Sequence, residues 1–242
     1  GFDDVLALSP SEALLDVGCG DGAFLAGLHA SGHDGRLVGV DIETELVVAA
    51  RDRASAEYAR GAVGRHERDQ GRSVEFMTAD AAHLPFSDAS FDAVTARYVI
   101  DHLADPAAAI AEARRVIRVG GRLVRIANAE GHLAEFWGLV PALAPAAGVP
   151  LETRFVELAA PHFDAVSVSY LSRIVVLLDA AVAVSLLDTH RMALSAVDDA
   201  EWAAARSGLM RPGSRQHPAF PVRVTLRLCV VRADVHAPDS RS

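Results

Sequence analysis

The stretch LLDVGCGDGAF, residues 14–24, decides the fold of this chain. It is an apolar run that breaks into three glycines spaced two residues apart, and a strand that ends in this way usually approaches a nucleotide. Read strictly, residues 18–23 (GCGDGA) satisfy the G-x-G-x-x-G/A fingerprint of dinucleotide-binding proteins. The fingerprint alone fits more than one cofactor, and the residues around it decide between them.

Short apolar runs alternate with helical patterns from residue 12 to about residue 127. The spacing predicts strands over 13–18, 36–41, 74–80, 91–99 and 120–128, the last entered through a double-glycine turn. It predicts helices over 22–31, 43–69 and 107–118. Such alternation produces right-handed βαβ units and a parallel sheet, with ligands at the carboxyl ends of the strands.

After residue 130 the pattern changes. We expect strands over 163–177 and 220–233, and helices over 132–148, 152–161, 179–194 and 197–208. The last strand alternates apolar and polar residues at its start, which is typical of an antiparallel strand. The predicted fold class is α/β: a Rossmann-like, doubly wound sheet of seven mostly parallel strands with an antiparallel last strand and helices on both faces. We expect residues 1–242 to be one domain with a helical lid inserted at about 130–162.

The composition excludes several classes of function. The chain has a net charge of −9 with acids and bases mixed along it, so no nucleic-acid partner is expected. All 23 basic residues are arginine, which excludes a Schiff-base or P-loop lysine. No Cys or His spacing indicates a metal site, and we predict none. The most apolar stretch, 174–187, is too short to span a bilayer, so we expect a cytoplasmic protein without membrane association.

Three carboxylates around the glycine turn argue against a dinucleotide. Asp16 lies two residues before Gly18, where it would repel a pyrophosphate but attract an ammonium group. Asp41 ends the second predicted strand, where an acid holds ribose hydroxyls. Asp80 ends the third, where an adenine amino group could donate to it. A ligand with a ribose, an adenine and a cationic amino-acid end but no phosphate fits these acids, and S-adenosylmethionine is such a ligand.

Four stretches carry a resemblance to a known family: LLDVGCGDGAF, VGVDIE, TADAAHLPFSDASFDAVTARYVIDHLADP and EARRVIRVGGRLVRI. They cover roughly residues 11–127 in order and spacing, and the chain resembles the class I S-adenosylmethionine-dependent methyltransferases, in the small-molecule branch that includes enzymes of ubiquinone and menaquinone biosynthesis. Beyond residue 130 the match is one of architecture only. The resemblance implies S-adenosylmethionine as cofactor, S-adenosylhomocysteine as product and a small molecule as methyl acceptor.

The resemblance also implies a cofactor site. It comprises Asp16, Gly18, Cys19, Gly20, Asp41, Ile42, Asp80, Ala81 and Arg97. The glycines let the backbone pass close beneath the methionine and ribose portions, where a Cβ would clash. Asp16 would accept from the ligand's ammonium group, and Asp41 from both ribose hydroxyls. Asp80 would accept from the adenine amino group, the backbone N–H of Ala81 would meet a ring nitrogen, and Ile42 would pack on the adenine face.

The end of the fourth predicted strand should face the methionine portion and the acceptor. Arg97 could pair with the ligand's carboxylate, or equally with Asp16 or Asp101. Methyl transfer needs a nucleophile in line about 3 Å from the methyl carbon, with water excluded, and an oxygen or nitrogen nucleophile also uses a general base. His102 follows this strand and is the candidate base, with a capping or packing role at the start of a helix as its alternative.

The segment after the fifth predicted strand supplies weaker candidates. Glu130 and His132 are second choices for a base, and Phe136 and Trp137 could line an apolar acceptor pocket or pack against the sheet. The acceptor would then be a hydrophobic small molecule, either a natural-product intermediate or a quinone-like ring, methylated on O, N or C.

Three other functions stay open. The same fold and cofactor pocket could serve a reaction without methyl transfer, such as a cyclisation. The fingerprint alone would indicate an NAD-dependent oxidoreductase, and a protein-interaction role without catalysis is the third. We expect a monomer or a homodimer.

Overall fold

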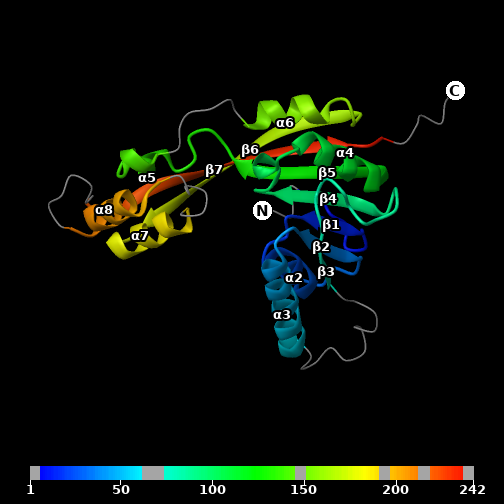
Figure 1. The fold of residues 1–242 in the computed structure, drawn as a ribbon, viewed down its shortest axis with the longest axis horizontal. Coiled ribbons are helices and arrows are strands. Elements are labelled where there is room, and N and C mark those ends of the chain that lie inside the picture. The colour runs from blue at the N-terminus through cyan, green and yellow to red at the C-terminus, as the bar shows by residue number, and fades with distance from the viewer. Residues whose placement is uncertain (1–5, 62–73, 145–150, 191–196, 212–218, 237–242) are drawn as a thin grey trace. The chain divides into compact units, whose positions relative to one another are not determined.

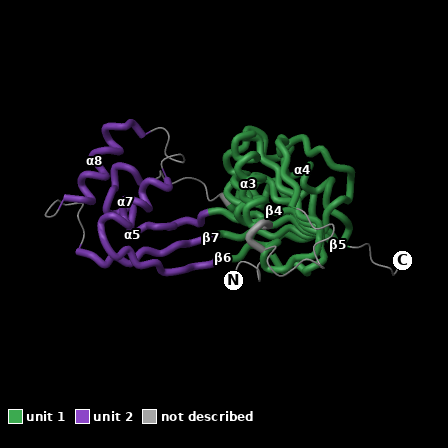
Figure 2. The backbone as a smooth tube through the Cα atoms, turned by 90° about the horizontal axis from the view of Figure 1, so that it is seen from below, with its two compact units in different colours: residues 1–127, 151–169, 229–242 green, residues 128–150, 170–228 purple. Residues whose placement is uncertain are grey.

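The computed structural model describes residues 6–61, 74–144, 151–190, 197–211 and 219–236 (Figure 1). The chain folds as two compact units (Figure 2). Unit 1 comprises residues 1–127, 151–169 and 229–242, and unit 2 comprises residues 128–150 and 170–228. The segment 130–162, predicted as a lid, is therefore divided between the two units at residue 150.

Seven strands form one sheet in the order β3-β2-β1-β4-β5-β7-β6. They are β1 (Leu14–Val17), β2 (Leu37–Asp41), β3 (Val74–Thr78), β4 (Phe91–Arg97), β5 (Ile117–Asn128), β6 (Ala165–Leu177) and β7 (Val222–Asp234). The first five strands pair in parallel. Gly120 donates its N–H to the carbonyl of Val235, and Ala129 donates to that of Arg227, so β7 runs antiparallel to β5. The predicted Rossmann-like sheet with an antiparallel last strand is confirmed.

Helices cover both faces of the sheet. Successive side chains of a strand point to opposite faces, and Ala96 of β4 lies beside Arg125 of β5 in register. The Arg97 guanidinium lies 4.0 Å from the ring centroid of Phe24, in the first helix, whereas that of Arg125 lies 5.5 Å from the ring of Phe155. The helices that carry these two rings therefore pack on opposite faces.

Three of the described helices begin at an aspartate whose side chain caps the first turn. The described helices are α2 (Ala23–Ala30), α3 (Thr44–Gly61), α4 (Pro106–Val116), α5 (Ala134–Trp137), α6 (Leu151–Ala159), α7 (Ala180–Thr189) and α8 (Asp199–Met210), with 3-10 turns η1 (Ile100–His102) and η2 (Pro141–Leu143). The three with this cap are α4, α7 and α8. Asp105 accepts from the backbone N–H of Ala108 at the start of α4, and Asp179 caps α7 in the same way. Proline at the first position of α4 has the backbone angle that this position needs.

Two local predictions are wrong. The helix expected over 132–148 is replaced by α5, only four residues long, and η2, because Leu133 takes a left-handed conformation and Pro141 begins the 3-10 turn. The double glycine does not precede the fifth strand: β5 begins at Ile117 and runs through it, with a shift of register against β4. The predicted helix over 43–69 is described to Gly61, and its remainder lies outside the described residues.

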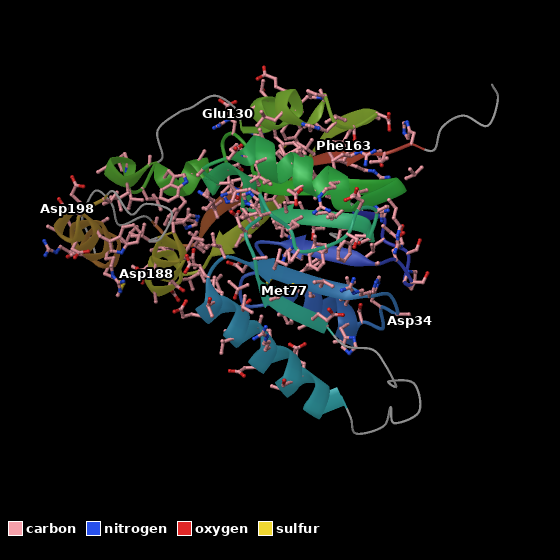
Figure 3. The ribbon with its side chains drawn as sticks, turned by 45° about the vertical axis from the view of Figure 1, so that its right-hand side comes forward. Asp34, Met77, Glu130, Phe163, Asp188 and Asp198 are labelled. Atoms are coloured by element: carbon pink, nitrogen blue, oxygen red, sulfur yellow. The ribbon has the colours of Figure 1, made fainter. Side chains whose placement is uncertain are left out.

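Unit 2 has its own apolar core. The buried side chains of Phe136, Trp137 and Trp202 pack there with residues of α7 and β7. Asp188 at the end of α7 accepts from Arg206 of α8 at 2.6 Å, and Figure 3 labels Asp188. The core and this ion pair together fix α8 against α7.

Candidate active site

The glycine turn, residues 18–22, connects β1 to α2 at the carboxyl end of β1. Gly18, Gly20 and Gly22 all have positive φ, at 68, 56 and 72°, a conformation that L side chains rarely adopt. A Cβ at Gly18 would lie 2.6 Å from the side chain of Val99, so this position requires glycine. A Cβ at Gly20 would meet no atom of the described residues within 4 Å, so the space beside Gly20 is open to a ligand.

Asp41 holds the middle of the glycine turn. Its Oδ2 accepts from the backbone N–H of Gly20 at 2.8 Å, and its Oδ1 accepts from Glu43 at 3.1 Å. Each oxygen keeps a further lone pair that can accept from a ligand hydroxyl. Ile42 follows with 65% of its surface exposed, as a residue that packs on a ligand would be. Cys19, inside the turn, is buried, and burial raises the pKa of its thiol to about 12.

Asp80 lies beside Asp41. The backbone N–H of Ala79 donates to the carbonyl oxygen of Asp41, which ties the loop after β3 to the end of β2. Asp80 Oδ1 accepts from the N–H of Ala82 at 2.9 Å, and its Oδ2 lies 3.2 Å from Nδ1 of His83. These two hydrogen bonds lower the pKa of Asp80, so it is ionised at neutral pH. Ala81, the next residue, is buried.

Asp16 is a buried carboxylate that already has two partners. Thr95 donates its hydroxyl to Oδ1 at 2.7 Å, and Arg97 donates from Nη2 to Oδ2 at 2.9 Å. Burial raises the pKa of Asp16, while Arg97 and Thr95 oppose the rise. Of the two protein partners left open for Arg97, Asp16 and Asp101, the structure shows the pair with Asp16. Thr95 had not been predicted at the site, although its position two residues before Arg97 puts both side chains on one face.

The end of β4 turns sharply into η1. Tyr98 has a φ of 57°, which is rare for a residue with a side chain, and its N–H donates to Ile126 at 2.8 Å. His102 is exposed at the end of η1, and its backbone N–H donates to the carbonyl of Val99 at 2.9 Å. The structure therefore places the candidate base at the carboxyl edge of the sheet, beyond Arg97.

Asp101 pairs with Arg125 of β5 and not with Arg97. The Arg125 side chain is 1% exposed, and its Nε and Nη1 have no hydrogen-bond partner in the part of the chain that the structure describes. Cys229 lies close to this pair: burial, together with the charges of Glu152 and Asp101, raises the pKa of its thiol to about 11, while Arg125 opposes the rise. Arg125 is not among the predicted site residues, although an arginine inside the apolar run LVRIA was the available signal.

The weaker candidates lie in unit 2. Phe136 and Trp137 are buried in its core, so both are packing residues. His132 Nδ1 lies 2.8 Å from the carbonyl oxygen of Arg227, and burial lowers the pKa of this histidine. Glu130 is exposed.

The first five strands and the site described above coincide with a known domain. Residues 15–125 match the protein family described as "Methyltransferase domain". These residues are a methyltransferase domain. The match contains the glycine turn, the three aspartates of the predicted cofactor site and His102.

Curated relatives match about half to three fifths of this chain. A demethylmenaquinone methyltransferase of Roseiflexus castenholzii is 34% identical over 156 residues, which is 61% of this chain and 59% of that protein. A 27-O-demethylrifamycin SV methyltransferase of Amycolatopsis mediterranei is 37% identical over 119 residues, 49% of this chain and 39% of that protein. The chain thus spans well under two thirds of the length of these relatives.

Solved structures share the fold of the domain. The YcgJ protein of Bacillus subtilis superposes with a TM-score of 0.61 at 18% identity, covering 98% of this chain and 97% of that one. The [4+2]-cyclase SpnF superposes with a TM-score of 0.54 at 21% identity, covering 97% and 79%. The architecture seen around the methyltransferase domain is therefore that of known proteins over nearly the whole chain.

Two features are absent from the residues that the structure describes. The His, Cys, Asp and Glu side chains of these residues include no group of three or more arranged to hold a metal ion. Among their helices, none combines the length and the apolar character that crossing a bilayer requires.

Proposed function

We propose that this chain transfers a methyl group from S-adenosylmethionine to an O, N or C nucleophile of a small hydrophobic molecule, with S-adenosylhomocysteine as product. One observation carries the proposal: the carboxylates of Asp16 and Asp41 lie close to the glycine turn, and the loop that carries Asp80 is tied to Asp41. These groups suit a cationic adenosyl ligand and would repel the pyrophosphate of a dinucleotide. The family match over the same residues supports the same cofactor.

The residues present fit this cofactor. Asp16 and Arg97 offer a carboxylate and a guanidinium side by side, the complement of an ammonium and a carboxylate on one amino-acid end. Asp41 would accept from the ribose hydroxyls while it holds the N–H of Gly20. The open space beside Gly20 would let the ligand lie against the backbone.

The adenine end would be held from the loop after β3. Asp80, ionised and exposed, would accept from the adenine amino group, and the N–H of Ala81 would donate to a ring nitrogen. Ile42, exposed at the end of β2, would cover one face of the ring. Gly18 and Cys19 would line the turn beneath the methionine portion, where no larger residue than glycine fits at position 18.

The acceptor would approach the end of β4. When bound, the cofactor supplies a methyl group on a positively charged sulfur, which a correctly placed nucleophile attacks in line. His102 would take the proton from an oxygen or nitrogen acceptor and pass it to water, for which its exposure suits it. A hydrophobic acceptor is supported by the names of two relatives, which act on a demethylmenaquinone and a rifamycin.

The decisive experiment follows the methyl group. Purified protein incubated with methyl-labelled S-adenosylmethionine and a panel of quinols, phenols and macrolactams should release label into one class of acceptor. An acceptor that is converted while the bound cofactor keeps its methyl group would instead favour a cyclisation. That second function is proposed because the SpnF cyclase has the same fold.

Removing the Asp41 carboxylate should weaken cofactor binding. Asp41→Ala loses a charge-assisted contact to the ribose and the hydrogen bond that shapes the turn at Gly20. We expect a loss of about 1–3 kcal/mol, measured by titration calorimetry with S-adenosylhomocysteine. Asp52→Ala, an exposed position on α3, is the matched control. Unchanged affinity in Asp41→Ala would contradict the ribose role.

The domain organisation is part of the proposal: residues 1–242 would act as one domain, with the segment at about 130–162 as a lid. One domain predicts one cooperative unfolding transition. Differential scanning calorimetry of the whole chain should then show a single peak that S-adenosylhomocysteine moves to higher temperature. Two peaks, of which the ligand moves only one, would count against it.

A further inference from the structure

Arg125 is a buried cation that the proposed mechanism does not use. It lies on β5 opposite Ala96, and its side chain is 1% exposed. Of its three guanidinium nitrogens, Nη2 donates to Asp101, while Nε and Nη1 have no hydrogen-bond partner among the described residues. Buried donors without partners cost free energy, and an apolar side chain of similar length would avoid that cost. Stability alone therefore does not account for an arginine at this position.

The partner of Arg125 belongs to the turn that carries the candidate base. Asp101 is the central residue of η1, and His102 is the next residue. The turn itself has few bonds: His102 donates its N–H to Val99 at 2.9 Å, and Leu103 donates to Ile100 at 3.3 Å. A short 3-10 turn has poor hydrogen-bond geometry and needs a tertiary contact to hold one conformation.

Arg125 is a rigid anchor for such a contact. Its backbone is part of β5, which pairs with β4 over Ala93–Arg97. Its guanidinium lies 5.5 Å from the ring centroid of Phe155 in α6, a residue that is itself 1% exposed. The Asp101 side chain, 12% exposed, reaches this anchor from the turn. A charge-assisted hydrogen bond between Arg125 and Asp101 in these buried surroundings fixes both the direction and the length of the contact.

We propose that Arg125 is a positioning residue of the acceptor site: through its ion pair with Asp101 it holds η1, and with it His102, at the carboxyl end of β4. The role of His102 in this inference rests on the proposed function. Arg125 does not touch the reacting atoms, since the sheet buries it, and its effect reaches the site only through Asp101. The Arg125–Asp101 pair thus fixes the position of His102 relative to the methyl acceptor.

The test is a double variant, Arg125→Met with Asp101→Leu. Either single change leaves a buried charge without its partner and should destabilise the fold, whereas the double change removes both charges and should unfold close to the wild-type temperature. We expect the double variant to keep the KM for S-adenosylmethionine but to lose kcat on the order of 10²-fold, because the turn is no longer held. Hydrogen exchange at the amides of His102 and Leu103 should be faster than in the wild type.

Each outcome decides the matter. A double variant with wild-type kcat overturns the inference whatever its exchange at η1, and so does one that loses kcat while exchange at η1 is unchanged. If the double variant does not fold, Arg125→Lys, which keeps the charge with a shorter reach, gives the answer: faster exchange at η1 supports the inference, and unchanged exchange overturns it. If the wild type transfers no methyl group at all, the proposed function fails, and exchange at η1 still decides whether Arg125 holds the turn.

A surface ion pair provides the control. Arg36 and Glu75 lie 3.2 Å apart with both side chains nearly half exposed. Exposed pairs of this kind contribute little to stability. Arg36→Met should therefore leave kcat, KM and the exchange at η1 as in the wild type.

Discussion

His102→Ala is expected to lower turnover of an oxygen or nitrogen acceptor by about 10²–10⁴-fold, the usual contribution of a general base. His102 ends η1, exposed, beyond the Asp16–Arg97 pair at the carboxyl edge of the sheet. The predicted cofactor contacts come from other residues, so affinity for S-adenosylhomocysteine should be almost unchanged. Steady-state kinetics with a methylated acceptor and titration calorimetry measure the two quantities separately.

The control for this variant is His162→Ala. His162 is also exposed and follows α6. Its backbone makes hydrogen bonds, since its N–H donates to the carbonyl of Ala159 at 2.9 Å and its carbonyl accepts from Arg114 at 3.0 Å. It should keep wild-type turnover. A normal rate in His102→Ala would mean that His102 merely ends the 3-10 turn, and that the acceptor loses its proton without help from this side chain.

Arg97→Met is expected to destabilise the fold by about 3–5 kcal/mol, since removal of one partner from a buried ion pair leaves the other charge uncompensated. The Asp16 side chain is 1% exposed and that of Arg97 is 20% exposed. A loss of this size would lower the midpoint of thermal unfolding by roughly 6–20 °C for a chain of this length. Cofactor affinity should fall as well, because the guanidinium is the proposed partner of the ligand's carboxylate.

The same variant has a defined pH dependence. Burial already raises the pKa of Asp16 above its ordinary value of 3.8, and without Arg97 the pKa rises further. Between the ordinary and the raised pKa, the folded state holds a proton that the unfolded state has released, so stability falls as pH increases through this window. The deficit of Arg97→Met should therefore be greatest at neutral pH and shrink as the pH is lowered. Urea unfolding at several pH values measures it, Arg97→Lys is the milder control, and a deficit independent of pH would contradict the assignment.

Most of the fold follows from local sequence. Continuous apolar runs bounded by turn residues mark buried parallel strands, and all seven predicted strands are present. The segment at 132–148 was mispredicted because helical periodicity there competes with Gly138 and Pro141, and the backbone follows the proline. The spacing of apolar residues alone does not indicate whether the helix or the break at the proline prevails.

Some features of the candidate site also follow from local sequence, and others do not. The sequence predicts that the aspartates at the carboxyl ends of β1, β2 and β3 lie close together, because the carboxyl ends of parallel strands meet at one edge of a sheet. The pairing of Arg97 with Asp16 could not be read from the sequence, since Asp101 is far nearer along the chain and Asp16 is 81 residues away. The pair of Asp101 with Arg125 depends on the register between β4 and β5, which no local pattern encodes.

The placement of the tryptophans gives the molecule a built-in optical probe. The chain has two, Trp137 and Trp202, and both lie in the core of unit 2. The proposed cofactor site lies in unit 1 and contains none. Intrinsic tryptophan emission therefore monitors unit 2 alone. Any change of emission on adding S-adenosylhomocysteine would show that binding in unit 1 alters the surroundings of the tryptophans in unit 2.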